Sequence, residues 1–397
     1  MIESSATTPI SRDVVARIGA SEPAAVRDAR LAAFAAFESM PFPTESTLGW
    51  RRTDLAGIDL HPIAPAPSTC IIRLPQAASQ AGVVSSTLEE AVRRHPVAAV
   101  SSVHTGLSFR KFSALAQAAW QQGGFLQIPP GSNIVEPIHI DWQTGPYPRL
   151  AIVVGKNARA TVVEQHGQQE PFVSGRVDLV LEDGAHLNYI HVQDSSRESV
   201  VFSHQRAEIA RDAKLVTLNF GLGGKLARTD VEVELMGAGA ESDMLGLVFA
   251  EGEQQFDYHT LQGHRSPNTR SDLLFKAALD DRSHSAYTGV IIIDRGAQRS
   301  DAYQANRNLL LSEGARADTE PMLEIEADDV RCTHGATVGP VDEEQLFYTE
   351  SRGLAPDTAA RLIVEGFFDE VFEKFGEPSV TKLLQGKVAP HVARVGA

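Results

Sequence analysis

A cysteine and a histidine two residues apart, Cys332 and His334, are the residues of this chain best suited to chemistry. On an extended strand, residues i and i+2 point to the same side, so the thiol and the imidazole are expected to share one face. Both groups bind iron and zinc, and a thiolate, which a nearby imidazolium favours, can also accept sulfur. A metal site needs about four ligands. The pair is therefore either incomplete or completed by another chain.

The other candidates for chemistry are weaker. His259 and His264, with Asp257, could form a second metal cluster, but their spacing leads into a predicted turn at Pro267 and is unspecific. Structural polar contacts are the favoured interpretation of these three residues. Cys70 lies in an apolar run, where a free cysteine behaves as a small buried hydrophobic residue, and we assign it no role.

The composition limits the partners. The chain has 397 residues, with 36 Lys+Arg against 51 Asp+Glu and a net charge of -15, which disfavours nucleic acid and anionic membranes and fits a basic protein partner. Two cysteines make no disulfide framework and indicate a reducing compartment. No apolar run of about 18 residues occurs, and the first residues lack the basic and apolar segments of an export signal. We therefore expect a cytoplasmic protein without a membrane partner.

Residues 1–125 are predicted to be a helical region that a Pro-rich linker, residues 61–67, divides. Pro23 suits a first helical turn, and apolar residues from Val26 to Phe37 then recur at helical spacing. These helices are expected to cap the structure that follows.

Residues 126–350 are predicted to form the core, which is mainly β. Short alternating apolar runs are typical of strands, and small-residue turns ending in Ala158, Ala185, Ala213 and Ala240 separate them at intervals of 27, 28 and 27 residues. Further copies end at Ala297 and Ala315, after a gap of 57 residues that would fit two intervals. Such a loose period indicates a solenoid, and the β pattern favours a parallel β-helix with open sheet edges at its ends. An antiparallel β-sandwich is the alternative.

Residues 351–397 are predicted to be helical. An apolar stripe runs along the first helix, and four of its members could form a surface for docking a partner: Phe367, Phe368, Val371 and Phe372. The alternative is that these side chains pack against the solenoid.

The sequence resembles the SufB/SufD family of iron-sulfur cluster assembly proteins over roughly residues 255–375. The motif Cys332 to Thr337 reads Cys-Thr-His-Gly-Ala-Thr and resembles the SufD form at each position. Further segments match in the family's order: Asp257–Thr260, His264, Thr269–Asp272, Lys276, Ala297–Gln298, Ala302–Leu311, Pro321–Ile325 and Asp328–Val330.

The resemblance implies a right-handed parallel β-helix with helical segments at both ends. It also implies a non-catalytic scaffold that pairs with a SufB-like paralogue and docks a SufC-like ABC-type ATPase through the helices of residues 351–397. Cys332 and His334 would then support a nascent cluster at the subunit interface, as metal ligands shared with the partner chain. No cofactor would be stably bound: the iron-sulfur cluster is transient in the complex and ATP sits on the ATPase. Consistent with this, the chain has no Gly-x-x-x-x-Gly-Lys-Ser/Thr loop. A homodimer is the expected association of the chain when it is alone.

Two enzyme classes are the alternatives. Many β-helices act on polysaccharides with clustered acidic side chains, and Glu324, Glu326, Asp328 and Asp329 could serve that chemistry. A metallohydrolase built on Cys332, His334 and His264 is the other.

Overall fold

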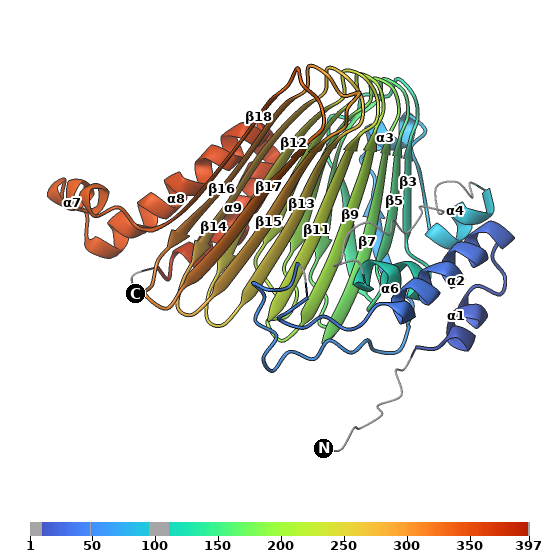
Figure 1. Ribbon diagram of the computed structural model, residues 1–397, viewed down its shortest axis with the longest axis horizontal. Coiled ribbons are helices and arrows are strands. Elements are labelled where there is room, and N and C mark those ends of the chain that lie inside the picture. The colour runs from blue at the N-terminus through green and yellow to red at the C-terminus, as the bar shows by residue number, and fades with distance from the viewer. Residues whose placement is uncertain (1–9, 48, 95–110, 396–397) are drawn as a thin grey trace.

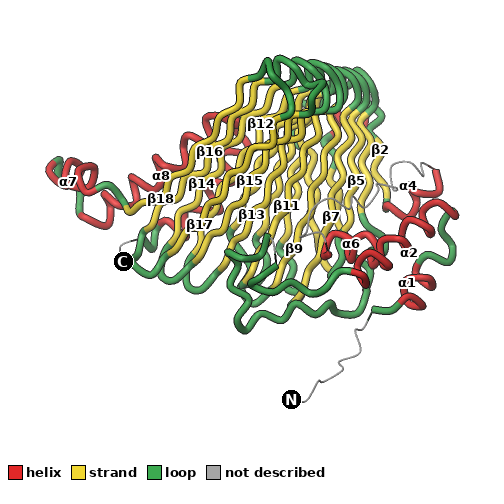
Figure 2. The backbone as a smooth tube through the Cα atoms, in the orientation of Figure 1, coloured by secondary structure: helices red, strands yellow, loops and turns green. Residues whose placement is uncertain are grey.

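Two stacked β-sheets of nine strands each form the centre of the molecule (Figures 1 and 2). The computed structural model describes residues 10–47, 49–94 and 111–395. From β3 onward the chain alternates between the sheets, so that odd-numbered strands lie in one, the odd sheet, and even-numbered strands in the other, the even sheet. All pairings between these strands are parallel. The predicted β-solenoid is confirmed.

Strand lengths become uniform along the solenoid. The odd sheet contains β3 (Gly124–Ile128), β5 (Arg149–Val154), β7 (Phe172–Leu181), β9 (Val200–Ile209), β11 (Leu226–Leu235), β13 (Gln255–His264), β15 (His284–Ile293) and β17 (Arg316–Ile325). The even sheet contains β4 (Ile138–Thr144), β6 (Arg159–His166), β8 (His186–Gln193), β10 (Lys214–Gly221), β12 (Glu241–Ala250), β14 (Arg270–Leu279), β16 (Asp301–Leu310) and β18 (Arg331–Pro340).

The repeated small-residue turns lead from the odd sheet to the even sheet. Their central residues adopt the left-handed conformation that Gly, Asn and Asp tolerate best: Asn157 (φ 56°), Gly184 (φ 68°), Asp212 (φ 55°) and Gly239 (φ 74°). The alanine after each of them is fully buried. The backbone N–H of each central residue donates to a carbonyl of the next turn, so the turns stack into a ladder.

The later turns of this row, one of which lies in the gap of the sequence period, have another residue in place of the alanine. Asn268 and Arg299, both with φ 59°, continue the series, and Thr269 and Ser300 take the place of the alanine. The prediction for Ala315 was wrong, because this residue lies between β16 and β17, in the opposite row of turns. Because polar residues replace the alanine and the turns are spaced farther apart, the later repeats were not recognised in the sequence.

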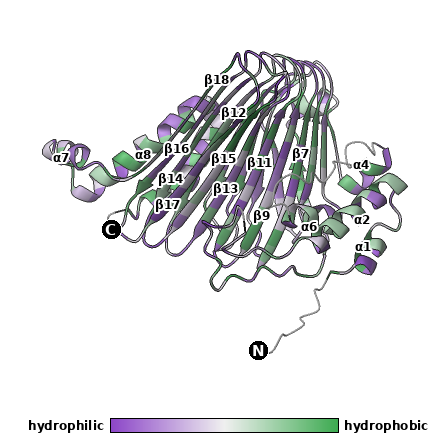
Figure 3. Cartoon of the chain, in the orientation of Figure 1, coloured by the Kyte–Doolittle hydropathy of each residue, from purple (hydrophilic) through white to green (hydrophobic). Residues whose placement is uncertain are grey.

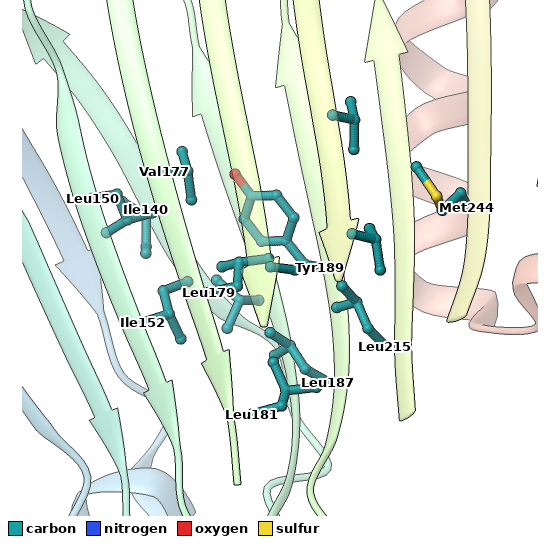
Figure 4. Packing of buried hydrophobic residues seen from close by; sticks show 14 of the residues in the cluster. Ile140, Leu150, Ile152, Val177, Leu179, Leu181, Leu187, Tyr189, Leu215 and Met244 are labelled. Atoms are coloured by element: carbon teal, nitrogen blue, oxygen red, sulfur yellow. The ribbon is translucent and has the colours of Figure 1, made fainter. Parts of the chain in front are cut away.

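The main core lies between the two sheets (Figure 4). Apolar and polar residues alternate along the strands (Figure 3). The inward ones, such as Leu179, Leu187 and Leu215, are buried (Figure 4). Because the side-chain period of a strand is two, one register of pairing brings the apolar residues of every coil to the same interior.

The N-terminal helices lie at the beginning of the solenoid, most of them over the outer face of the odd sheet. They are α1 (Arg12–Ile18), α2 (Ala24–Ser39), α3 (Gln76–Gln80), α4 (Leu88–Arg94) and α6 (Lys111–Ala119). Phe112 of α6 stacks on Phe202 of β9 with 3.7 Å between ring centroids, and Trp50 packs against both rings. Aromatic contacts therefore fix this cover to the outer face of the sheet.

The region before residue 126 also contributes strands, which the helical prediction did not include. β1 (Thr69–Arg73) pairs antiparallel with β4, and β2 (Val84–Ser86) pairs antiparallel with β3. These short strands end the even and odd sheets on the N-terminal side.

Three helices follow the solenoid: α7 (Glu343–Ser351), α8 (Pro356–Phe375) and α9 (Pro378–Val392). α8 and α9 pack on the outer face of the even sheet, whereas α7 projects from the body and buries no residue (Figure 1). Gly376, at φ 74°, ends α8 in the left-handed conformation usual for a helix C-terminus. Within the described ranges no helix is long and apolar enough to cross a membrane.

Candidate site at the open end of the solenoid

The last strands of the two sheets, β17 and β18, leave the C-terminal end of the solenoid open. Each has ten residues and pairs on one side only, β17 with β15 and β18 with β16. In the described part of the chain nothing pairs with their other edges. An unpaired edge presents a row of N–H and C=O groups that can pair with another chain.

Cys332 and His334 lie on this last strand and face the interior of the solenoid. Their register partners on β16 are Ala302 and Gln304, both 1% exposed inside the solenoid. The shared face expected from their spacing is present. Cys332 is half-buried and packs against a small cluster that includes Ile293, whereas His334 is exposed. The pair is thus displayed on the open cross-section of the solenoid.

Burial acts against the thiolate in the isolated chain. Loss of solvation raises the pKa of the Cys332 thiol, and the neighbouring charge of Asp301 adds to the effect. This is opposite to the activation by an imidazolium that the sequence suggested. A bound metal ion would be needed to favour the thiolate here, because coordination deprotonates a thiol.

The chain does not bring a third metal ligand to this pair. Within the described residues, the one group of three metal-binding side chains lies elsewhere. His264, the third member of the suggested metallohydrolase site, is buried, and its ring nitrogens contact the hydroxyls of Thr269 (2.7 Å) and Ser271 (2.9 Å). Burial lowers its pKa to about 4. The trio of Cys332, His334 and His264 is therefore not assembled.

Asp257 and His259 serve as structural contacts. They lie on the outer face of β13, where Asp257 Oδ2 accepts hydrogen bonds from Thr53 Oγ1 and Arg228 Nη1, both at 2.6 Å, and Asp257 Oδ1 lies 2.9 Å from His259 Nε2. His264 lies five residues beyond His259 and so faces the other way. The structural interpretation of these residues is confirmed.

The remaining candidates also lack a site geometry. Burial raises the pKa of Cys70 to about 12, which fits the absence of an assigned role. The acidic side chains considered for polysaccharide chemistry are all exposed, on β17 or in the turn after it, and belong to no such metal-binding group among the described residues: Glu324, Glu326, Asp328 and Asp329.

The apolar stripe of α8 packs on its own solenoid. Phe368, Val371 and Phe372 are 1%, 0% and 5% exposed in the cluster between α8, α9 and the even sheet. Phe367 is half-buried, and its carbonyl accepts a 2.7 Å hydrogen bond from Lys276 Nζ. In this arrangement the side chains free to meet a partner are others, on α7 and the outer side of α8: Phe347, Tyr348 and Leu362, at 73%, 59% and 50% exposed.

One cluster was missed in the sequence. Glu164, His166 and His191 lie together inside the solenoid. Glu164 and His191 are 27 residues apart, which is the repeat length, and they are register partners on β6 and β8. The repeat length of the turns therefore predicts that Glu164 and His191 lie side by side on neighbouring strands.

These features define a class of protein: a β-solenoid with a covered beginning and a partial thiol-imidazole pair on its open end. A family described as "SUF system FeS cluster assembly, SufBD core domain" matches residues 139–367. A SufBD family iron-sulfur cluster assembly protein of Mycobacterium bovis is 32% identical over 297 residues, which cover 71% of this chain and 74% of that protein. The iron-sulfur cluster assembly protein SufD of Escherichia coli is 30% identical over 238 residues, covering 59% and 56% of the two chains. The chain belongs to the SufBD family of iron-sulfur cluster assembly proteins.

Proposed function

We propose that this chain is a non-catalytic scaffold subunit of iron-sulfur cluster assembly that works in a complex with a SufB-like paralogue. The observation that carries the proposal is the open end of the solenoid, where two unpaired ten-residue edges flank the inward-facing pair Cys332 and His334. A second solenoid that meets this end continues both sheets and encloses the pair.

The cross-section itself favours a protein partner. Leu323, Ile325 and Val338 are on the interior face of β17 and β18, yet they are 36%, 41% and 43% exposed. Burial of such side chains contributes roughly 25 cal/mol for each Å² of apolar surface removed from water. The partner thus gains apolar contact as well as backbone hydrogen bonds.

Cys332 and His334 then act as two ligands of a nascent cluster, the cargo of the complex, and the paralogue supplies the other ligands. Coordination by iron would overcome the raised pKa of the Cys332 thiol, because a metal-bound thiol is deprotonated. Both cysteines of the chain are free, and a thiol that must stay reduced suits the cytoplasm.

The C-terminal helices are proposed to dock a SufC-like ATPase, which binds the ATP. Because the phenylalanines of α8 are largely occupied by the solenoid, the exposed Phe347 and Tyr348 of the projecting α7 are the better contact residues.

The edge contact is tested by blocking one backbone donor. In a parallel strand, successive residues direct their N–H and C=O groups to opposite sides. Arg331 N–H donates to Ser300 and Thr337 C=O accepts from Asn308 Nδ2, so odd-numbered residues of β18 face β16 and Ala336 faces the free edge. Ala336→Pro removes an edge donor, and Ala336→Ser is the matched control that keeps it.

The full chain is co-expressed with SufB-like and SufC-like proteins. We expect a stable complex for the wild type and for Ala336→Ser, and loss of the SufB-like subunit for Ala336→Pro. A second pair of variants, Cys332→Ala and His334→Ala, is expected to keep the complex and to lose cluster formation. Absence of any wild-type complex would overturn the scaffold, and normal cluster formation in both variants would remove the pair from the mechanism.

A further inference from the structure

A second group of metal-binding side chains lies inside the solenoid, far from the open end. Glu164, His166 and His191 each offer one ligand atom, and these atoms lie within 4.8 Å of one another. The three residues are 0%, 7% and 3% exposed. β6, which carries two of them, is six strand positions from β18 in the even sheet, or roughly 29 Å at about 4.8 Å for each strand.

Two of these atoms face each other at a distance that either a hydrogen bond or a bridging metal ion can span. His166 Nε2 lies 2.9 Å from Glu164 Oε1, while His166 Nδ1 lies 3.2 Å from Gln168 Oε1. If Nδ1 donates its hydrogen to the Gln168 carbonyl, the Nε2 of a neutral ring presents a lone pair to a carboxylate. A proton or a metal ion must then bridge the two atoms. Ligand atoms about 2.1 Å from a metal and at right angles to each other lie roughly 3 Å apart.

The carboxylate is held from two other directions. Trp142 Nε1 donates a 2.5 Å hydrogen bond to Glu164 Oε1, and the Tyr189 hydroxyl donates to Glu164 Oε2. Such contacts orient a ligating carboxylate and raise the affinity of a site. Both donors come from neighbouring coils of the same sheet, β4 and β8.

His191 completes a set of two imidazoles and one carboxylate. Its ring packs on that of His166 with 4.8 Å between the centroids, and its one hydrogen-bond contact given by the structure is a long one, 3.5 Å from Nε2 to Ser203 Oγ. The ring is thus placed beside the other two ligands without a strong competing partner.

The lining around the three side chains is polar. Gln193 and Asn219 are the register partners of His166 and His191, and they are 2% and 1% exposed. Gln193 Nε2 and Asn219 Nδ2 have no hydrogen-bond partner in the described structure. These amide donors suit water molecules on the open positions of a three-ligand metal ion.

We propose that Glu164, His166 and His191 form an internal site for a divalent first-row transition metal, Fe²⁺ or Zn²⁺. Two imidazoles and one carboxylate are the ligand set of non-haem ferrous sites and of many zinc sites, whereas Mg²⁺ and Ca²⁺ prefer oxygen ligands. The site is built from one chain and needs neither the partner nor Cys332 and His334. A test of this site is therefore independent of the proposed scaffold function.

The test uses the full chain, stripped of metal and titrated with Co²⁺ without oxygen. The visible bands of Co²⁺ report nitrogen and oxygen ligands, and a thiolate charge-transfer band would report a cysteine. We expect one equivalent to bind with no thiolate band, in the wild type and equally in the Cys332→Ala/His334→Ala double variant. His191→Phe, which keeps a ring but no nitrogen, is expected to weaken binding at least about 100-fold, more than is typical for loss of an outer contact.

Because the site is buried, the chain is both incubated with Co²⁺ overnight and refolded in its presence. Absence of bound Co²⁺ after both treatments would show that a proton alone bridges Glu164 and His166 and would overturn the proposal. Equal binding by wild type and His191→Phe would do the same. If His191→Phe does not fold, Tyr189→Phe provides the test instead. This variant keeps all three ligands and is expected to weaken Co²⁺ binding about 10- to 100-fold. Unchanged affinity would overturn the proposal.

Discussion

The two ends of the solenoid differ in how their sheets finish. At the N-terminal end, strands of five and three residues pair antiparallel with β4 and β3, and helices cover the adjoining outer face of the odd sheet. At the C-terminal end, two ten-residue parallel strands finish the sheets with a free edge each and exposed interior side chains. Short edge strands and covering segments are common means of preventing edge pairing. The first end is therefore protected against edge pairing, whereas the second leaves two long strand edges free to pair.

The largest expected effect is on the covered end. Phe112→Ala removes a ring that stacks on Phe202 and touches Trp50, so it should lower the free energy of unfolding by roughly 3–5 kcal/mol. Phe347→Ala on the exposed α7 is the matched control and should change it by less than about 0.5 kcal/mol. Urea unfolding of both variants measures the difference, and equal destabilisation would remove the contrast between the ends.

The next effect concerns the polar interior near the open end. Folding lowers the pKa of His264 from 6.5 to about 4. Between these two pH values His264 is therefore protonated in the unfolded chain but neutral in the folded one. Stability is full above pH 6.5 and falls as the pH drops to 4, by roughly 3 kcal/mol from this residue. His264→Gln should flatten the pH dependence of unfolding over that range. An unchanged slope would show that other groups control acid stability.

A smaller effect is expected where α8 joins the even sheet. Lys276 Nζ contacts the Phe367 carbonyl at 2.7 Å and Glu370 Oε2 at 2.5 Å, so Lys276→Met should cost roughly 1.5–3 kcal/mol and speed amide hydrogen exchange in α8. Lys387→Met, which removes a partly exposed ion pair with Asp194, is the control and should cost less than about 1 kcal/mol. Exchange in α8 that stays slow in both variants would show that the apolar face alone holds this helix.

The smallest effect on stability is expected at the proposed chemical residue. Cys332 is half-buried on the last strand, and Cys332→Ala should change the free energy of unfolding by less than about 1 kcal/mol. The same variant is expected to lose cluster formation in the complex. A large loss of stability would instead assign Cys332 to the core and would weaken the distinction between the two ends.

The sequence predicted the solenoid because its turns repeat a backbone requirement, a left-handed residue followed by a buried alanine. Where Thr269 and Ser300 replace the alanine, the pattern was lost although the turn persists. β1 and β2 were missed for another reason: they are short, and their antiparallel partners lie far along the chain. Antiparallel pairing between distant segments produces no periodic pattern in the sequence.

The features of the candidate site that follow from local strand geometry could be predicted from the sequence. Two-residue spacing was enough to place Cys332 and His334 on one face, and five-residue spacing separates His259 from His264. The direction of the Cys332 pKa was not predictable, because it depends on the burial of the thiol and on the nearby Asp301, which the two-residue spacing does not reveal. An apolar stripe likewise does not reveal whether it meets its own sheet or another protein, as the buried Phe368 shows.

The finished N-terminal end also limits how many copies can associate. A solenoid with two free ends could add subunits without limit and grow into a fibre, as head-to-tail contacts do when they fail to close. Among the residues that the structure describes, the long free edges lie at one end of the solenoid, on β17 and β18. If subunits pair end to end through β17 and β18, as proposed, such an assembly would stop at two copies, because the short β1 and β2 disfavour further edge pairing.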